Sequence, residues 1–155
     1  MAGFSAPSTY DAIISVGDSL NYVTDERDFE AAIKSSYAYL NEEGIFIFDL
    51  NTEYKFKNIP PVTVDEVDDV LYIWENIYDE EEKLNTYGVN FFRNIRDNDY
   101  RRFYEEHLER AYDLSLVKNL LEKTGFKDLE VYDDYDFKDV GEETSRYTLV
   151  ARKFL

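Results

Sequence analysis

Two short apolar runs on either side of an amphipathic segment constrain the fold of this chain more than any other feature. Residues 12–16 (Ala-Ile-Ile-Ser-Val) and 45–48 (Ile-Phe-Ile-Phe) are apolar on both faces, as parallel strands covered on both sides are. Between them, Thr24 can cap a helix whose apolar residues, such as Ile33, recur at helical spacing. The pattern predicts a strand–helix–strand unit over residues 10–52, with two neighbouring parallel strands.

Polar side chains follow both predicted strands at their carboxyl ends. In open α/β sheets, ligands bind beyond these ends of the strands, so we expect function at this edge. The same residue types also favour turns for purely local reasons, and Asn51 can simply cap the loop that follows it. The candidate residues are Asp18, Ser19, Asn21 and Tyr22 after the first strand, and Asp49 and Asn51 after the second.

The rest of the chain changes character after a Pro-Pro pair at residues 60–61, which ends any regular element. Asp113 can cap a further helix that Gly125 is placed to end. We expect one domain over residues 1–155, in which an antiparallel meander follows the first unit and a helix with two closing strands completes the chain. The meander covers residues 70–112 with strands at 70–78, 84–95 and 100–112, and the last part covers residues 113–155 with strands at 126–132 and 147–154.

Composition excludes several classes of function. The 155 residues carry a formal net charge of −17, and the apolar content of 44% argues against disorder. Phosphate contacts need clustered Lys and Arg, so nucleic acid and anionic membrane are not expected partners. No stretch approaches the roughly 18 apolar residues of a membrane span. With no cysteine and no basic, apolar leader, the sequence predicts a cytoplasmic protein without disulfides or thiolate metal sites.

Several stretches resemble small bacterial class I S-adenosylmethionine-dependent methyltransferases. Residues 11–22 and 43–52 look like the fourth and fifth strands of that family with their polar elbows. Residues 72–75, 106–112, 124–126 and 146–153 resemble the later pieces in the same order. The resemblance implies an α/β fold with part of a Rossmann-like sheet, strands 4-5-7-6 of the family, and with the meander inserted.

The chain departs from this family in one respect. Such enzymes hold the cofactor with a glycine-rich turn after their first strand and an acid after their second, and this chain starts after both. Its six glycines are too far apart to form a G-x-G motif. We therefore expect the carboxyl-terminal part of a methyltransferase, inactive alone. A shortened form, an internal start and a protein completed by a partner, such as a missing amino-terminal half, all fit.

The resemblance also implies roles for individual residues. Asp18, Ser19, Asn21 and Tyr22 would line the space around the methionine part of the cofactor, S-adenosylmethionine. Asp49 and Asn51 would contact or orient a small-molecule substrate. Arg110 has two interpretations, as a residue that faces the substrate cavity or as one partner of an ion pair. Methyl transfer consists mainly of positioning and exclusion of water, so neither a catalytic triad nor a metal site is expected.

Two further residues have both a functional and a structural interpretation. His107, the only histidine, is a candidate general base because its unperturbed pKa lies near 6.5, but a lone histidine is more often structural. Strand alternation places His107 on the opposite face from Arg110, the other catalytic candidate. Trp74 can wall a substrate pocket or belong to the core, whereas Phe91 is expected in the core.

A second hypothesis assigns the chain to a different class of function. In this hypothesis the chain is a non-catalytic binding or oligomerisation module that derives from a methyltransferase. The strand over residues 12–16 contains no Lys or Pro to protect an open edge, so we expect a homodimer or a swapped oligomer.

Overall fold

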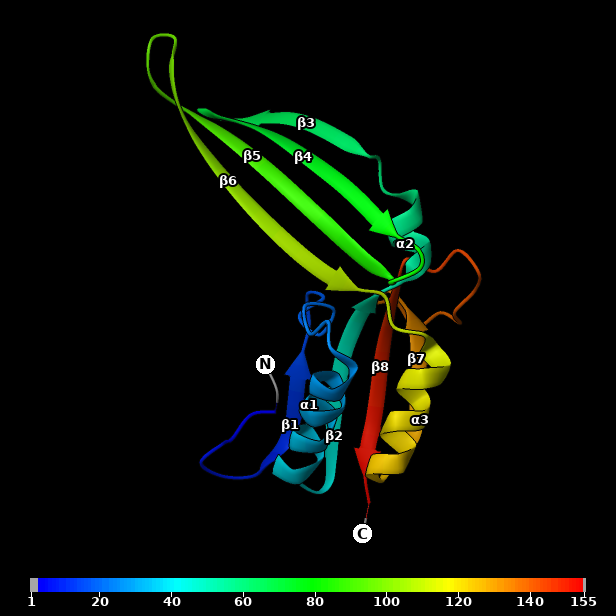
Figure 1. Ribbon diagram of the computed structural model, residues 1–155. Helices are drawn as coiled ribbons and strands as arrows, with labels where there is room; N and C mark the ends of the chain where they lie inside the picture. Colours follow the sequence, from blue (N-terminus) through cyan, green and yellow to red (C-terminus); the bar gives the residue numbers. More distant parts are fainter. Residues whose placement is uncertain (1–2, 155) are drawn as a thin grey trace.

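The first sheet forms around the strand–helix–strand unit, in a computed structural model that describes residues 3–154 (Figure 1). Strand β1 (Tyr10–Ser15) leads through helix α1 (Glu26–Tyr39) to strand β2 (Leu40–Asn51), and the two strands are parallel, with Ala12 opposite Ile45. Strands β8 (Arg146–Lys153) and β7 (Phe126–Asp133) continue the sheet in antiparallel pairing. The order β1-β2-β8-β7 is the expected order, and it leaves β1 at one edge.

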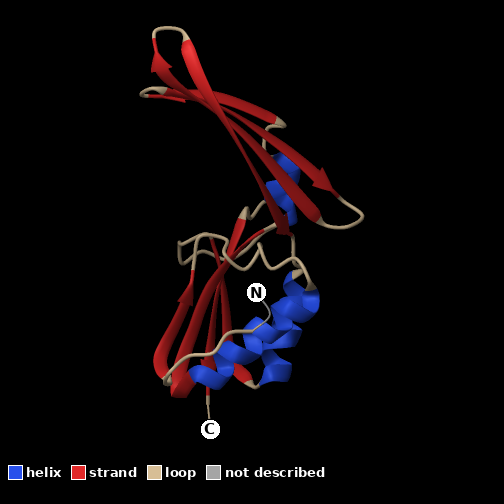
Figure 2. Cartoon of the chain, turned by 60° about the vertical axis from the view of Figure 1, so that its left-hand side comes forward, coloured by secondary structure: helices blue, strands red, loops and turns tan. Residues whose placement is uncertain are grey.

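The core of this half lies between the sheet and its two long helices. Helix α1 and helix α3 (Leu114–Thr124) pack side by side on one face, where Phe29, Ile33 and Phe48 are fully buried (Figure 2). We expected cover on both faces of the strands. Within residues 3–154, the opposite face has no helix, and Ile45 and Ile47 there line a hollow closed in part by the loop before β8.

The second sheet is a four-stranded antiparallel meander rather than the three strands we expected. Strands β4 (Val70–Asp79), β5 (Leu84–Arg96) and β6 (Asp99–Arg110) are joined by β3 (Val62–Val67), which pairs with β4. A short helix, α2 (Glu53–Asn58), precedes it. Both additions lie beside the Pro-Pro pair that we took as an end of regular structure. A proline is compatible with the start of an edge strand, where no ladder hydrogen bond is lost.

Local capping agrees with the sequence prediction at the end of α3 and differs at the start of both long helices, because Asp113 precedes α3 without a side-chain cap hydrogen bond. The N-cap of α1 is Asp25, not Thr24, and its side chain accepts hydrogen bonds from the backbone N–H groups of Arg27 and Asp28. Gly125 ends α3 as expected, with a left-handed φ of 116°.

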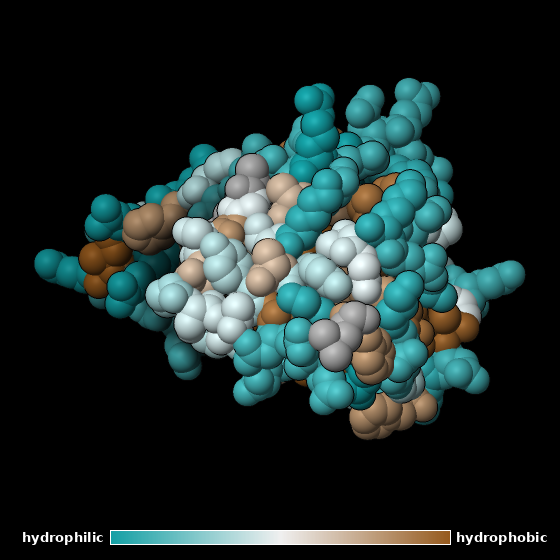
Figure 3. All heavy atoms as spheres, turned by 90° about the horizontal axis from the view of Figure 1, so that it is seen from below, coloured by the Kyte–Doolittle hydropathy of each residue, from teal (hydrophilic) through white to brown (hydrophobic). Residues whose placement is uncertain are grey.

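The two ends of the first sheet differ in character. The second sheet stands over the carboxyl ends of β1 and β2 (Figure 1). Seen from below, the opposite end is mostly hydrophilic, and its apolar residues appear as separate spots (Figure 3). No helix within residues 3–154 has the length and apolar character that crossing a bilayer requires. The candidate ligand site lies where the two sheets meet, at the carboxyl ends of β1 and β2.

Gly125 provides a test of the packing between α3 and α1. A Cβ at this position would lie 2.8 Å from the Tyr37 hydroxyl oxygen, and the left-handed backbone disfavours any other residue. We expect Gly125→Ala to lower the free energy of unfolding by about 1–3 kcal/mol in urea titrations. Gly141→Ala is the control, because a Cβ there meets nothing within 4 Å. Equal stability of both variants would contradict this packing.

Candidate functional site

The elbow after β1 is held by the carboxylate of Asp49, which lies at the end of β2 and is completely buried. Gly17 and Asp18 both adopt left-handed backbone conformations, which direct their N–H groups to this carboxylate at 2.9 and 2.8 Å. Arg146 Nη1 donates to Asp49 Oδ2 at 2.9 Å, and the Tyr135 hydroxyl donates to the same oxygen. Asp49 thus joins the elbow, β8 and the loop before β8.

A second set of hydrogen bonds joins the elbow to the second sheet. The Asn21 amide donates to the backbone oxygens of Asn51 and Arg110, at 3.0 and 2.8 Å, and its Oδ1 accepts from the Asn51 N–H. Asn21 and Asn51 are both buried. Because Arg110 ends β6, this amide fixes the end of the second sheet against the elbow.

A cleft of about 490 Å³ opens between the elbow, α2 and the second sheet. Trp74 lies on its wall with 37% of its surface exposed, and its ring meets that of Tyr87 edge to face at 5.3 Å. The lining of the cleft includes acidic, basic and aromatic side chains from the elbow, α2 and the second sheet. The lining residues are Asp18, Tyr22, Lys55, Ile59, Thr63, Tyr72, Trp74, Tyr87 and Glu109.

The Asn51 side chain organises the charged groups of this cleft. Its Nδ2 donates to Asp18 Oδ2 at 2.8 Å and to Glu109 Oε2 at 3.1 Å, while its Oδ1 accepts from Lys55 Nζ at 2.8 Å. Burial, with the Asp18 charge adding to it, raises the pKa of Glu109. Burial and the neighbouring Arg146 lower the pKa of Lys55. One amide therefore places two carboxylates and an amine around a single space.

Tyr22 adds a hydroxyl to this group. Burial and the Glu109 carboxylate raise its pKa, so the phenol stays protonated. Its ring also meets the His107 imidazole edge to face at 5.9 Å. The pKa of Tyr87, in the same wall, is raised by burial and by Glu109.

The structure separates the candidate residues into three groups. Asp18, Tyr22 and Trp74 line the cleft, and Ser19 is exposed beside it. Asp49, Asn51 and Asn21 are buried and bonded to other protein groups, so their contacts indicate positioning. His107 and Arg110 are not among the lining residues.

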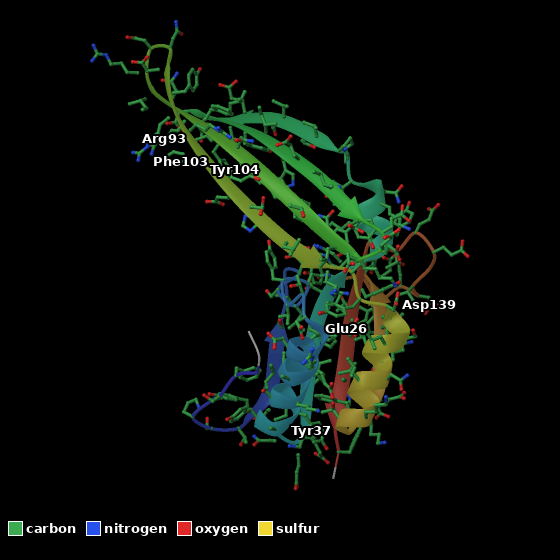
Figure 4. The ribbon with its side chains drawn as sticks, in the orientation of Figure 1. Glu26, Tyr37, Arg93, Phe103, Tyr104 and Asp139 are labelled. Atoms are coloured by element: carbon green, nitrogen blue, oxygen red, sulfur yellow. The ribbon has the colours of Figure 1, made fainter. Side chains whose placement is uncertain are left out.

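Arg110 does not face the cavity as the resemblance suggested. Its Nε donates to the Thr24 backbone oxygen, and its Nη1 lies 3.8 Å from Glu26, which Figure 4 labels at the start of α1. The cause is strand alternation along β6, which turns Glu109 toward the cleft and Arg110 away from it. The ion pair that was the alternative interpretation is the one observed. His107 shares the face of Glu109 and lies 3.6 Å from Glu105, and its role as a base stays a prediction.

Sequence reasoning missed Glu109, Lys55 and Tyr87. A signal for Glu109 was available, because it lies two residues after His107 on the same strand face. Lys55 lies on the unpredicted helix α2, where its spacing of four residues from Asn51 allows their contact. Within the described part of the chain, no group of three His, Cys, Asp or Glu residues is arranged to hold a metal ion.

Comparisons with known proteins agree with this architecture. The fold is similar to an S-adenosylmethionine-dependent methyltransferase from Clostridium acetobutylicum, with a TM-score of 0.88 and 30% identity, over 99% of this chain and 62% of that one. Two curated proteins named as putative methyltransferases also match, at 27% identity each. YqeM of Bacillus subtilis is covered over 59% of its length and GWCH70_2453 of Geobacillus over 60%, by 93% and 94% of this chain. No protein-family model matches the sequence.

By sequence and fold the chain is similar to S-adenosylmethionine-dependent methyltransferases. It spans about 60% of the length of these three proteins. The expected fold class, a Rossmann-like sheet with an inserted antiparallel meander, is confirmed.

The buried carboxylate provides the test of this site. Asp49→Ala leaves Arg146 without its buried partner and two backbone N–H groups without an acceptor, so we expect a loss of about 3–5 kcal/mol in the free energy of unfolding. Asp136→Ala is the matched control, because its ion pair with Lys138 is exposed and contributes about 1 kcal/mol or less. Urea titrations of both variants measure the difference. A loss at Asp49 no larger than that at Asp136 would refute the positioning role.

Proposed function

We propose that this chain forms the part of a methyltransferase that carries the active-site elbow and the acceptor-binding cleft. The observation that supports this most directly is the position of Tyr22. Its side chain lines the cleft on one side and, on the other, an apolar groove of about 380 Å³ between β1 and α1. A residue in both walls lies where a methyl donor and an acceptor would meet.

The elbow fits the methionine end of S-adenosylmethionine. Ser19 and Tyr22 are exposed and Asp18 is half-buried, so each has polar atoms that a ligand can reach, whereas the Asn21 amide is used within the protein. When bound, the cofactor supplies a methyl group on a sulfonium, whose carbon–sulfur electron pair stays on sulfur after transfer. The residues of this chain position the acceptor and exclude water from the reacting atoms.

The cofactor contacts outside the elbow are expected from the remainder of a complete enzyme. None of the six glycines in these 155 residues is close enough to another to form the turn that cradles the cofactor in the family. The proposal is thus that this polypeptide is inactive alone, and that it acts on a small molecule when the fold is completed.

Calorimetry with S-adenosylmethionine tests the first part of the proposal. We expect no binding tighter than about 100 μM by residues 1–155, because each missing buried hydrogen bond costs about 1–3 kcal/mol. Sub-micromolar binding by the isolated chain would show that these contacts are not needed.

A chimera tests the second part. The segment of the Clostridium acetobutylicum protein that this chain does not cover would be joined ahead of residue 1, and the fusion should bind S-adenosylmethionine at least about tenfold more tightly, a difference of about 1.4 kcal/mol. A chimera that unfolds cooperatively and still binds no cofactor would contradict the proposed function.

The open edge of β1 favours a second candidate, a self-associating module. Ile14 is 63% exposed and Val16 48% exposed at this edge, which no described strand covers. Unpaired strand edges without Lys or Pro readily add another strand. The two candidates differ in whether a second copy, or another part of the same enzyme, covers β1.

Light scattering distinguishes these two candidates. If β1 pairs with a second copy, the chain should be a dimer or closed oligomer at tens of micromolar, and Ile14→Lys should convert it to a monomer. Glu42→Lys is a control that makes a charge change at an exposed site outside β1. A stable monomer with fast amide exchange at Ile13 and Ile14 would exclude pairing at this edge.

A further inference from the structure

The cleft holds a buried carboxylate that forms no direct ion pair with a basic side chain in the described part of the chain. Glu109 is 2% exposed, and within residues 3–154 no Lys or Arg lies within ion-pair distance of it. Its carboxylate accepts from Asn51 Nδ2, which also binds Asp18. Burying a carboxylate without a cationic partner is costly, so this arrangement favours a ligand that brings positive charge.

Lys55 meets this need only in part. Its Nζ binds Asn51 Oδ1 at 2.8 Å and forms no direct ion pair with Glu109, and its charge offsets only part of the rise that burial causes in the pKa of Glu109. Counting formal charges, the cleft lining carries Asp18 and Glu109 against Lys55 alone. An anionic ligand would therefore meet an excess of negative charge.

The aromatic walls are an independent observation that points to the same ligand. Trp74, Tyr87, Tyr72 and Tyr22 all line the cleft. The rings of Trp74 and Tyr87 are in edge-to-face contact, with an angle of 75° between their planes. Faces of aromatic rings attract organic cations, most strongly those of tryptophan.

We propose that the cleft binds an organic amine in its protonated form as the methyl acceptor, with Glu109 as the carboxylate that pairs with the ammonium group. This rests on the proposed function and names the substrate class of its site. The ammonium must lose one proton before its nitrogen has a lone pair to be methylated. Glu109 accepts that proton, and the Tyr22 hydroxyl beside it stays protonated throughout.

The elevated pKa of Glu109 agrees with this role, because it brings the carboxylate closer to the range in which it can hold a proton. Asp18 shares the Asn51 amide with Glu109, so a second carboxylate lies beside the proposed ammonium position. The two carboxylates thus have separate tasks, one in proton transfer and one in charge stabilisation.

The chain itself provides the reporter for a binding test. Trp74 is its only tryptophan, so intrinsic fluorescence reports directly from the cleft. Benzylamine, which is cationic at pH 7, would be titrated beside its neutral analogue benzyl alcohol and the anion benzoate. We expect benzylamine to bind at least about tenfold more tightly than benzyl alcohol, since hydrogen bonds to charged groups contribute about 1.5–3 kcal/mol, and benzoate to bind most weakly.

Variants assign the preference to Glu109. Glu109→Gln keeps the shape of the side chain and should reduce the preference for benzylamine to less than about threefold, which corresponds to about 0.6 kcal/mol. Glu106→Gln is the matched control, because the same strand turns Glu106 to the opposite face, and it should leave the preference unchanged. Asp18→Asn serves as the second variant if Glu109→Gln does not fold.

Equal affinity for benzylamine and benzyl alcohol in the unaltered chain, or tighter binding of benzoate, would overturn the amine assignment. So would a full cation preference in folded Glu109→Gln. The titration needs no cofactor, so these failures leave the cofactor experiments untouched. A chimera that does not bind S-adenosylmethionine would instead overturn the proposed function, whatever the fluorescence shows.

Discussion

The geometry of this molecule depends on one buried carboxylate, that of Asp49. A charge removed from water must be compensated by partners, and here two backbone N–H groups, a guanidinium and a phenol surround it. The left-handed conformation of Asp18 is unfavourable on its own and is stabilised by these bonds, whereas Gly17 adopts its left-handed conformation without steric cost. Because Arg146 and Tyr135 come from the last part of the chain, their bonds to Asp49 join the elbow to β8 and to the loop before it.

Amide side chains continue this hydrogen-bond network from the first sheet to the second. Asn21 binds the backbone on both sides of the junction, and Asn51 carries the contact on to Asp18, Glu109 and Lys55. An amide can donate and accept at once, so it suits a position between carboxylates and an amine. The neutral amides thus hold both the buried carboxylate of Glu109 and the partly exposed Asp18 and Lys55 in the cleft.

The sequence was sufficient for the parts of the fold that bury apolar residues. The runs around Ile14 and Phe46 predicted parallel strands, and the end of α3 followed from Gly125 because only a left-handed position requires that residue. Strand β3 was missed because all six of its residues are exposed, so burial left no pattern to find. Glu109 was missed because it is one acid among 34 acidic residues, and its spacing of two residues from His107 was the one feature that set it apart. The contacts of Asp49 depend on residues nearly a hundred positions away, which spacing alone does not reveal.

Charge is distributed unevenly along the second sheet, and this affects which molecules reach the cleft. At the far end, where Figure 4 labels Arg93 and Phe103, Arg93 lies directly opposite Arg101, and the Arg101 guanidinium stacks on the Phe103 ring at 5.0 Å. At the near end of the same face lies Glu109, and Asp18 of the elbow shares the Asn51 amide with it. Fields from exposed charges are screened within about 8 Å at physiological salt, so the two ends act separately on an approaching ligand. Arg93 at the far end is already paired with Asp69 at 3.2 Å, whereas Glu109 in the cleft has no direct ion pair within the described residues, so an amine of the proposed class would meet an uncompensated carboxylate in the cleft.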